Sequence, residues 1–127
     1  MAPFRFAEWC LRGKEIQLFG DGKQSRDFTY VDDIAVGTIA ALQKRLPGFE
    51  IINLGGGGER TTILEMIEMI GEFAGKEPII KFLPVAQGDM LHTSASIEKA
   101  RRLLDWEPLT SLTSGLKDLL EWHKNIQ

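Results

Sequence analysis

Apolar residues recur along this chain at two spacings, one typical of helices and one typical of strands. The helical spacing is clearest between residues 63 and 74, where the apolar residues are Ile63, Met66, Ile67, Ile70, Phe73 and Ala74. Thr62 and Glu65, three residues apart, have the spacing of a capping box at the start of this helix. Gly75 is a typical residue after a helix end. We therefore predict a helix here, with one face against a core.

The same spacings, together with turn residues, predict the remaining elements. Further helices are expected at residues 3–12 and 33–45, and after the capping residues Ser96 and Ser111. Strands are expected at residues 16–19, 26–31, 50–54 and 79–83. The first two strands are expected to pair like a hairpin across the turn residues that separate them. The chain is thus predicted to be an α/β protein with short mixed strands and about five helices.

Two of these elements carry an expectation about burial. Helix 33–45 is expected to turn an apolar stripe toward the core. The stripe consists of Ala35, Ile39, Leu42 and Leu46. Strand 50–54 is expected to be mostly buried, because three of its five residues are large and aliphatic.

Length, charge and cysteine content narrow the class of protein. The 127 residues suit a single domain, residues 1–127, with a real core. A net charge of -3 argues against nucleic acid or an anionic membrane as the main partner. No apolar run approaches the roughly 20 residues that a membrane-spanning helix needs. A single cysteine, Cys10, cannot form an internal disulfide, and the first five residues lack a signal-peptide pattern, so we expect a cytoplasmic protein.

A short strand that runs directly into a helix is predicted around Arg26. Arg26, Phe28 and Tyr30 share one face of this strand, because strand side chains alternate between sides. Asp32 or Asp33 then suits the first turn of the helix, where free backbone N–H groups need an acceptor.

Two roles are open for Arg26. A guanidinium at the rim of such a unit can hold a phosphate through paired hydrogen bonds. The alternative is an ion pair with Asp33 or Asp89, which contributes little stability at a surface. Taken by themselves, the residues slightly favour the ion pair.

The other polar and glycine-rich features indicate no catalytic or metal site. The glycines at 55–58 lack the Lys-Ser/Thr ending of a P-loop and the spacing of a dinucleotide fingerprint, so we predict a turn. His92 and His123 have no cysteine or histidine partner at metal-ligand spacing. Asp32 and Asp33 are adjacent and point apart on a helix, which favours capping over paired acid–base chemistry.

Six short motifs follow one another along the chain. They occupy residues 1–6, 13–22, 26–33, 53–55, 88–89 and 99–108, the longest being GKEIQLFGDG, RDFTYVDD and KARRLLDWEP. In order and spacing they resemble the C-terminal part of the extended short-chain dehydrogenase/reductase family, the nucleotide-sugar epimerases and dehydratases. Within that family the chain is most similar to the UDP-sugar 4-epimerase group, UDP-glucuronate 4-epimerases above all.

The resemblance implies a substrate-binding portion without the N-terminal dinucleotide-binding core. The strand matching Gln17, Leu18 and Phe19 would offer backbone groups to the uracil ring, with Phe19 packing near it. The arginine matching Arg26 would bind the diphosphate, and Asp89 would lie beside the sugar nucleotide. A π-face, strand-edge amides and a guanidinium are together what a uridine diphosphate needs.

The chain also departs from the family pattern. Ala86 stands where many relatives have an arginine or glutamine for the phosphates, and Gln87 is expected to compensate. The glycine-rich NAD fingerprint is absent. The only tyrosine, Tyr30, is followed four residues later by Ile34 rather than by lysine, so the family's catalytic Tyr-x-x-x-Lys pair is absent too. We therefore predict no catalytic, cofactor-binding or metal-binding residue in this chain.

The chain looks like the C-terminal piece, beginning at Met1, of a longer NAD-dependent UDP-sugar 4-epimerase. The implied partners are a UDP-sugar and the missing N-terminal Rossmann domain, with a homodimer in the whole enzyme. The chain alone is not expected to catalyse epimerisation. Two alternatives remain open: a fragment of a nucleotide-sugar 4,6-dehydratase or decarboxylase of the same family, and a stand-alone, non-enzymatic binding or interaction module.

Overall fold

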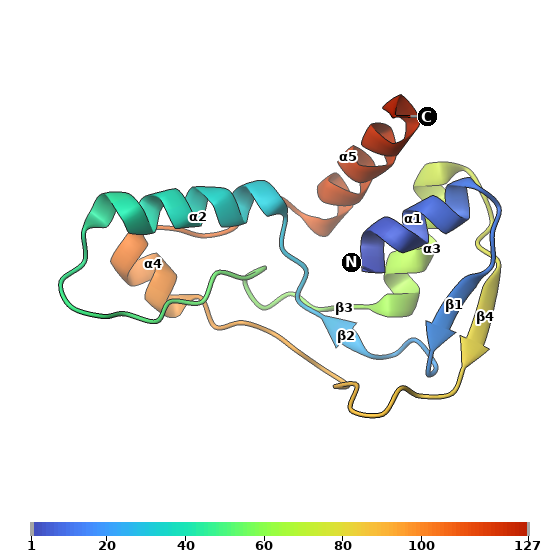
Figure 1. The fold of residues 1–127 in the computed structure, drawn as a ribbon, viewed down its shortest axis with the longest axis horizontal. Helices are drawn as coiled ribbons and strands as arrows, with labels where there is room; N and C mark the ends of the chain where they lie inside the picture. Colours follow the sequence, from blue (N-terminus) through green and yellow to red (C-terminus); the bar gives the residue numbers. More distant parts are fainter. Residues whose placement is uncertain (1, 127) are drawn as a thin grey trace. The chain divides into compact units, whose positions relative to one another are not determined.

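A computed structural model describes residues 2–126, which contain five α-helices and four short strands (Figure 1). Their order is α1 (Ala2–Leu11), β1 (Ile16–Phe19), β2 (Ser25–Arg26), α2 (Val31–Lys44), β3 (Thr61–Thr62), α3 (Ile63–Ala74), β4 (Ile80–Leu83), α4 (Glu98–Leu104) and α5 (Leu112–Asn125). The predicted α/β class is confirmed. None of these helices is long and apolar enough to cross a bilayer. Met1, where the resemblance begins, lies outside the described residues.

The chain divides into two compact units that alternate along the sequence. The first unit takes its described residues from 1–26, 61–92 and 113–127, and the second consists of residues 27–60 and 93–112. The chain therefore passes from the first unit to the second and back more than once. That residues 1–127 form a single domain stays a prediction.

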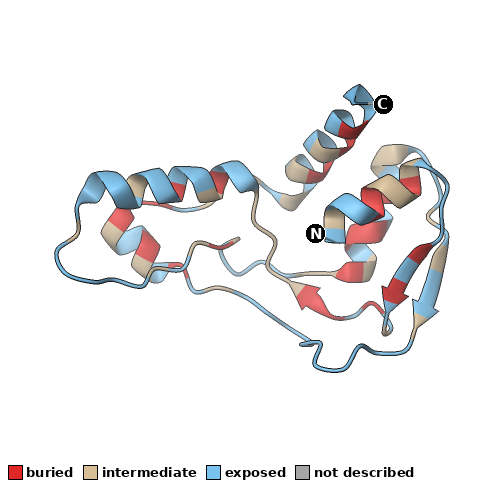
Figure 2. Cartoon of the chain, in the orientation of Figure 1, coloured by how far each residue is buried: buried red, intermediate tan, exposed pale blue. Residues whose placement is uncertain are grey.

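The first unit is built on a parallel pair of strands with helices packed beside it. β1 and β4 pair in register from Ile16 opposite Ile80 to Phe19 opposite Leu83. α1 packs against both α3 and β1. The largest side chains that are fully buried in this unit are Ile16, Leu18, Met66, Ile67, Ile70, Leu116 and Leu120 (Figure 2). They form the core that fixes the position of β1.

The predicted hairpin between the first two strands is wrong. β2 pairs instead with β3, where Ser25 lies opposite Thr62 in an antiparallel arrangement. The turn after β1 is held by Gln24, whose side-chain amide donates to the carbonyl of Phe19 at 2.7 Å. The carbonyl of Gln24 in turn accepts the N–H of Ile63 at 3.0 Å. These bonds direct the chain toward the start of α3 rather than back along β1.

The predicted strand 26–31 also ends early, at Arg26. The next residue, Asp27, belongs to the second unit and accepts the N–H of Ala95 on Oδ2 at 3.0 Å. The side chain of Asp27 thus holds two loops of the second unit together at the point where a longer strand would have continued.

The second unit has its own small core between α2 and α4. Ile97, Ala100, Leu104 and Trp106 form it, with Ala40, Leu46, Ile52, Leu54 and Leu103 packed around them. The indole N–H of Trp106 donates to the carbonyl of Asp33 at 2.9 Å. Gly37 permits this approach, because a Cβ there would lie 2.8 Å from Leu54 and 3.0 Å from Trp106.

The expected capping role of the aspartates at the start of α2 is wrong. The N-cap is Tyr30, and no side chain makes a capping bond there, although Asp32 and Asp33 do lie in the first turn. The carboxylate of Asp33 is nearly buried and accepts the backbone N–H groups of Leu109 at 3.2 Å and Thr110 at 3.0 Å. The second unit therefore uses this carboxylate to hold a distant loop.

Of the predicted apolar stripe of α2, only Leu46 packs on the core, and the other three residues do not face it as predicted. Ile39 and Leu42 are 52% and 80% exposed, and Ala35 is exposed as well. The buried positions of the helix are Asp33 and Gly37, on the opposite side. The expected strand at 50–54 is also wrong, because no described strand lies beside it to pair with it.

The capping predictions for the other helices had mixed outcomes. The capping box of α3 is confirmed: Thr62 Oγ1 accepts the N–H of Glu65 at 3.2 Å, and Glu65 Oε2 accepts the N–H of Thr62 at 2.8 Å. The predicted cap of α4 by Ser96 is wrong. The helix begins one residue later, after Ile97, so Ser96 lies outside the capping position.

Candidate functional site

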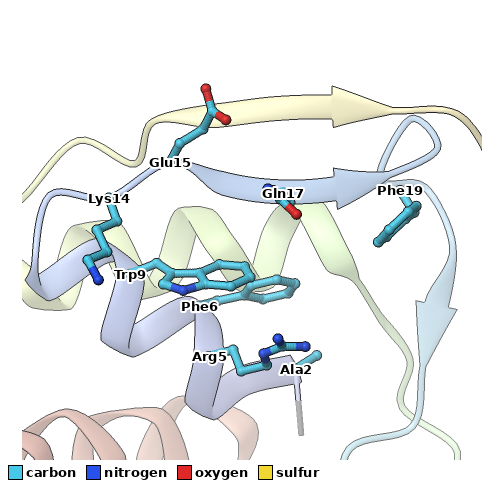
Figure 3. Close-up of a pocket in the computed structure, with 8 residues that line it drawn as sticks. All are labelled: Ala2, Arg5, Phe6, Trp9, Lys14, Glu15, Gln17 and Phe19. Carbon is cyan, nitrogen blue, oxygen red and sulfur yellow. The ribbon is translucent and has the colours of Figure 1, made fainter.

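A cavity of about 640 Å³ lies between α1 and β1 in the first unit (Figure 3). It is lined by Ala2, Arg5, Phe6, Trp9, Lys14, Glu15, Gln17 and Phe19. Figure 3 shows the rings of Phe6 and Trp9 side by side on α1, with Gln17 and Phe19 along β1. The volume and the mixture of aromatic and polar walls are typical of small-molecule sites.

The backbone of β1 uses only one of its edges for the sheet. The N–H of Ile16 donates to the carbonyl of Ile79 at 2.7 Å, and the N–H of Gly20 donates to the carbonyl of Leu83 at 2.9 Å. The even-numbered residues therefore point their backbone groups at β4. In a parallel ladder the intervening residues point theirs the opposite way.

Gln17 and Phe19 are those intervening residues. The carbonyl of Phe19 is occupied by the Gln24 side chain. Among the described residues, no backbone bond outside the ladder with β4 engages the N–H or C=O of Gln17. Both side chains are exposed, while Leu18 between them is buried. The cavity wall thus contains the unpaired backbone N–H and C=O of Gln17. The neighbouring residue, Leu18, is packed in the core and holds this part of the strand in place.

The α1 side of the cavity was not identified from the sequence. The centroids of Phe6 and Trp9 are 6.1 Å apart with a 46° angle between rings. The guanidinium of Arg5 lies 5.3 Å from the centroid of the Trp9 ring, a cation–π geometry. Their three- and four-residue spacing places these side chains on one helix face. This spacing is the sequence feature that could have identified the α1 wall of the cavity.

Arg26 lies in an ion pair with Asp89. Arg26 Nη2 is 2.6 Å from Asp89 Oδ1, and Arg26 Nη1 donates to the carbonyl of Ser25 at 2.9 Å. Of the two carboxylates considered as partners, the structure selects Asp89. Asp33 instead accepts backbone N–H groups within the second unit.

The segment around Asp89 is tied to β2 by further bonds. The N–H of Ser25 donates to the carbonyl of Leu91 at 2.8 Å, and Ser25 Oγ lies 2.8 Å from Nδ1 of His92. Gln87 is exposed in the turn closed by the bond from the Asp89 N–H to the Ala86 carbonyl at 3.1 Å. His92 therefore has a structural partner in Ser25.

Four of the six predicted site residues fall into two groups, while Leu18 is buried and Gln87 is exposed in its turn. Gln17 and Phe19 line the cavity, and Arg26 and Asp89 form the ion pair. None of Arg26, Gln87 and Asp89 lines the cavity itself. The structure brings each pair together, and their roles in binding stay predictions.

The remaining candidate groups have packing roles. A Cβ at Gly56 would lie 2.1 Å from Asp27 Oδ1, so the glycine loop is packed against that side chain. His123 is buried, with its ring centroid 4.6 Å from that of Phe4. Burial raises the pKa of the Cys10 thiol, and the charge of Lys76 opposes this only in part. A neutral thiol is a poor nucleophile.

Comparisons with known proteins identify the class to which this arrangement belongs. The profile of the NAD dependent epimerase/dehydratase family matches residues 2–55. The UDP-glucuronate 4-epimerase of Thermodesulfobacterium geofontis (strain OPF15) is 47% identical over 128 residues, which cover 100% of this chain and 39% of that protein. UDP-glucuronic acid decarboxylase 1 of Danio rerio is 34% identical over 113 residues, which cover 89% of this chain and 26% of that protein.

Solved structures point to the same class of protein as the sequence comparisons. The crystal structure of UDP-glucuronic acid 4-epimerase from Bacillus cereus, in complex with UDP-glucuronic acid and NAD, superimposes with a TM-score of 0.93 at 39% identity. The match covers 100% of this chain and 40% of that one. The fold is therefore a partial extended short-chain dehydrogenase/reductase fold.

The profile match over residues 2–55 and the similarity of the whole chain to epimerases confirm the resemblance drawn from its motifs. The chain spans about 40% of the length of the relatives it matches.

Proposed function

We propose that this chain supplies the UDP-sugar-binding part of an NAD-dependent nucleotide-sugar 4-epimerase of the UDP-glucuronate or UDP-glucose/galactose type. The observation that carries the proposal is the cavity between α1 and β1, where a free strand edge meets aromatic side chains. Supporting it is the similarity to epimerases over the whole chain.

The uracil ring occupies this cavity. Uracil presents an N–H donor between two carbonyl acceptors. The free N–H and C=O of Gln17 complement one such donor–acceptor pair. The rings of Phe6, Trp9 and Phe19 supply the apolar surface that a planar base needs. The backbone of Gln17 sets orientation, and the aromatic side chains supply most of the buried area.

The diphosphate binds to Arg26. A guanidinium has five N–H donors, and the ion pair with Asp89 and the contacts to the carbonyls of Ser25 and Leu91 engage only part of them. Asp89 lies beside the sugar nucleotide, and Gln87 reaches the phosphates from its exposed turn. Because the Arg26 side chain is partly exposed and not all of its N–H groups are engaged, the remaining N–H groups are available to phosphate oxygens.

The chemistry belongs to the whole enzyme. NAD, held by an N-terminal Rossmann domain that this chain lacks, supplies hydride exchange at C4 of the sugar. This chain contributes orientation of the substrate, which can lower a barrier by several kcal/mol, on the order of 7–11 in the best intramolecular cases. The whole enzyme is a cytoplasmic homodimer in this proposal.

Decarboxylation is the second candidate reaction. It is favoured by the 34% identity to UDP-glucuronic acid decarboxylase 1 of Danio rerio. A decarboxylase of this kind also binds a UDP-sugar, so this chain has the same part in both reactions. The catalytic groups that distinguish them lie outside the chain.

The test is a UDP titration of the isotope-labelled chain, followed by amide NMR shifts, with NAD as a control ligand. We expect saturable shifts at Gln17, Phe19 and Arg26 with UDP, none with NAD, and loss of affinity in Arg26→Ala. Well-dispersed spectra with no UDP shifts up to millimolar concentration would contradict the binding role. NAD-dependent epimerisation by the pure chain would contradict the assignment of catalysis to the missing part.

A further inference from the structure

The segment after β4 has no regular structure of its own (Figure 1). Residues 84–91 belong to no helix or strand, and His92 makes a single parallel bridge to Ser25. Every residue from 84 to 92 is exposed, so no buried side chain of its own anchors the segment. The position of the segment therefore depends on the polar contacts that it makes with β2.

These contacts converge on Ser25 and Arg26. Asp89 pairs with Arg26. The carbonyl of Leu91 accepts the N–H of Ser25 at 2.8 Å, and Nδ1 of His92 lies 2.8 Å from Ser25 Oγ. Ser25 is only 6% exposed and is paired with β3, so it is a fixed point in the first unit. His92 is the residue whose side chain connects the exposed segment to that fixed point.

The guanidinium of Arg26 takes its orientation from the same segment. Nη2 of Arg26 is 2.6 Å from Asp89 Oδ1. Nη1 lies 3.5 Å from the carbonyl of Leu91 and 2.9 Å from that of Ser25. Two of these three acceptors belong to residues 89–91. A shift of the segment would move both of them, whereas the carbonyl of Ser25 would stay with β2.

The ring of His92 is held through one nitrogen. No residue within 2–126 bonds Nε2, so the contact between Nδ1 and Ser25 is what places the ring. The hydroxyl of Ser25 can donate to Nδ1 of a neutral imidazole. The two residues are not a nucleophile and its base, because the buried hydroxyl of Ser25 is out of reach of a substrate.

We propose that His92 is a positioning residue for the diphosphate site. Its Nδ1 contact with Ser25 holds residues 89–92 against β2. Asp89 and the carbonyl of Leu91 then hold the guanidinium of Arg26 ready for phosphate oxygens, which lowers the ordering cost of binding. The inference rests on the proposed diphosphate role of Arg26, and it adds a residue that makes no phosphate contact itself.

The first measurement needs no ligand. The Nε–H signal of Arg26 and its hydrogen-exchange rate are followed by NMR in the isotope-labelled chain. In His92→Ala we expect the signal to move toward the position of a free arginine and to exchange faster. In Met90→Ala, which truncates an exposed side chain of the same segment, we expect neither change. An unchanged Arg26 signal in His92→Ala would overturn the proposal.

The second measurement compares the affinities of UDP and uridine. His92→Ala is expected to lower UDP affinity about threefold to tenfold, the range of one neutral hydrogen bond. Uridine affinity should stay the same, because uridine carries no phosphate. His92→Asn should bind UDP like the parent, because asparagine places an amide group at the position of Nδ1. His92→Gln places its amide group at the position of Nε2 and should lose as much as His92→Ala.

A double substitution tests whether His92 acts through Ser25. Ser25→Ala removes the hydroxyl that Nδ1 contacts, so it should lower UDP affinity as much as His92→Ala does. The variant with both substitutions should lose no more than either single variant, because the two residues form one contact. Losses that add up in the double variant would contradict this route.

The outcomes separate this inference from the proposed function. Loss of UDP affinity in Arg26→Ala but not in His92→Ala would overturn the inference alone. Equal losses in His92→Asn and His92→Ala would mean that the ring contacts the phosphates itself, and equal losses for UDP and uridine would mean a general disturbance. Either result would overturn the positioning role. If the parent chain binds no UDP, the proposed function is contradicted, and the ligand-free Arg26 signal decides whether His92 orients Arg26.

Discussion

Arg26 and Asp89 form an ion pair in which Nη2 of the guanidinium lies 2.6 Å from Oδ1 of the carboxylate. The pair joins segments that are 63 residues apart in the sequence. A second guanidinium nitrogen donates to the carbonyl of Ser25. The side chains of Arg26 and Asp89 remain 24% and 33% exposed, so the pair orients the guanidinium and leaves it partly exposed.

Arg26→Lys is expected to weaken UDP binding with little loss of stability. Lysine keeps the charge but lacks the planar fork that holds two phosphate oxygens. We expect UDP affinity to fall about tenfold, because hydrogen bonds between charged groups contribute about 1.5–3 kcal/mol. The free energy of unfolding should change by no more than about 1 kcal/mol, as for other exposed ion pairs. Calorimetric UDP titration and urea unfolding measure the two effects.

Arg12→Lys is the matched control for this prediction. Arg12 is also an arginine of the first unit in an exposed ion pair, with Glu8 at 3.3 Å. It lies outside the proposed site, so its substitution should leave UDP affinity unchanged. Unchanged affinity in Arg26→Lys, or equal losses in both variants, would contradict the diphosphate role.

Trp9→Ala is expected to weaken binding of the base without affecting the phosphates. Trp9 forms part of the cavity wall beside Phe6. Stacking of a base on an aromatic side chain is worth about 1–3 kcal/mol, so UDP affinity should fall at least about fivefold while pyrophosphate affinity stays the same. Trp122→Ala, at a half-exposed position on α5, is the control. Equal losses for UDP and pyrophosphate would contradict a stacking role for Trp9.

The features that were predictable from the sequence are the local ones. The capping box of α3 depends on Thr62 and Glu65, which are three residues apart, so the pattern alone identifies it. Strand pairing depends on distant residues. Ile16 pairs with Ile80, although two helices and two strands lie between them in the sequence. No local signal separates that partner from the nearer β2. The hairpin prediction failed for this reason.

The candidate site was predictable in part. Gln17 and Phe19 were identified through a family motif, and they do lie on the cavity wall. The aromatic wall on α1 was missed, because Phe6 and Trp9 have the same spacing that core residues have. For α2, the sequence shows that Ile39 and Leu42 are apolar but does not show that they are exposed. The burial of this face of α2 was therefore predicted wrongly.

Asp33→Ala is expected to destabilise the second unit by about 2 kcal/mol, because it leaves two backbone donors without an acceptor. The carboxylate accepts the N–H groups of Leu109 and Thr110. Asp32→Ala removes the same charge from the same helical turn at an exposed position, and it should change stability by about 0.5 kcal/mol or less. Urea unfolding of both variants measures the difference. Equal effects would show that charge near the helix end, rather than the loop contact, is what matters.

The capping box of α3 should make stability depend on pH. Glu65 accepts bonds from the N–H and the hydroxyl of Thr62, each at 2.8 Å, and these bonds hold the pKa of Glu65 below its ordinary 4.5. The unfolded chain therefore takes up this proton first as pH falls. The stabilisation is fully present above about pH 4.5 and is lost as pH falls through the lower folded value.

Glu65→Gln is the variant that tests this dependence. Its stability deficit relative to the parent should be constant from pH 7 to about pH 5 and should shrink at lower pH, where the parent also loses the carboxylate. Thermal melts between pH 7 and pH 3 measure it. Glu68→Gln, at an exposed position on the same helix, is the control for loss of one negative charge. A deficit that does not shrink on acidification, or one that Glu68→Gln reproduces, would mean that the carboxylate of Glu65 adds nothing through the cap.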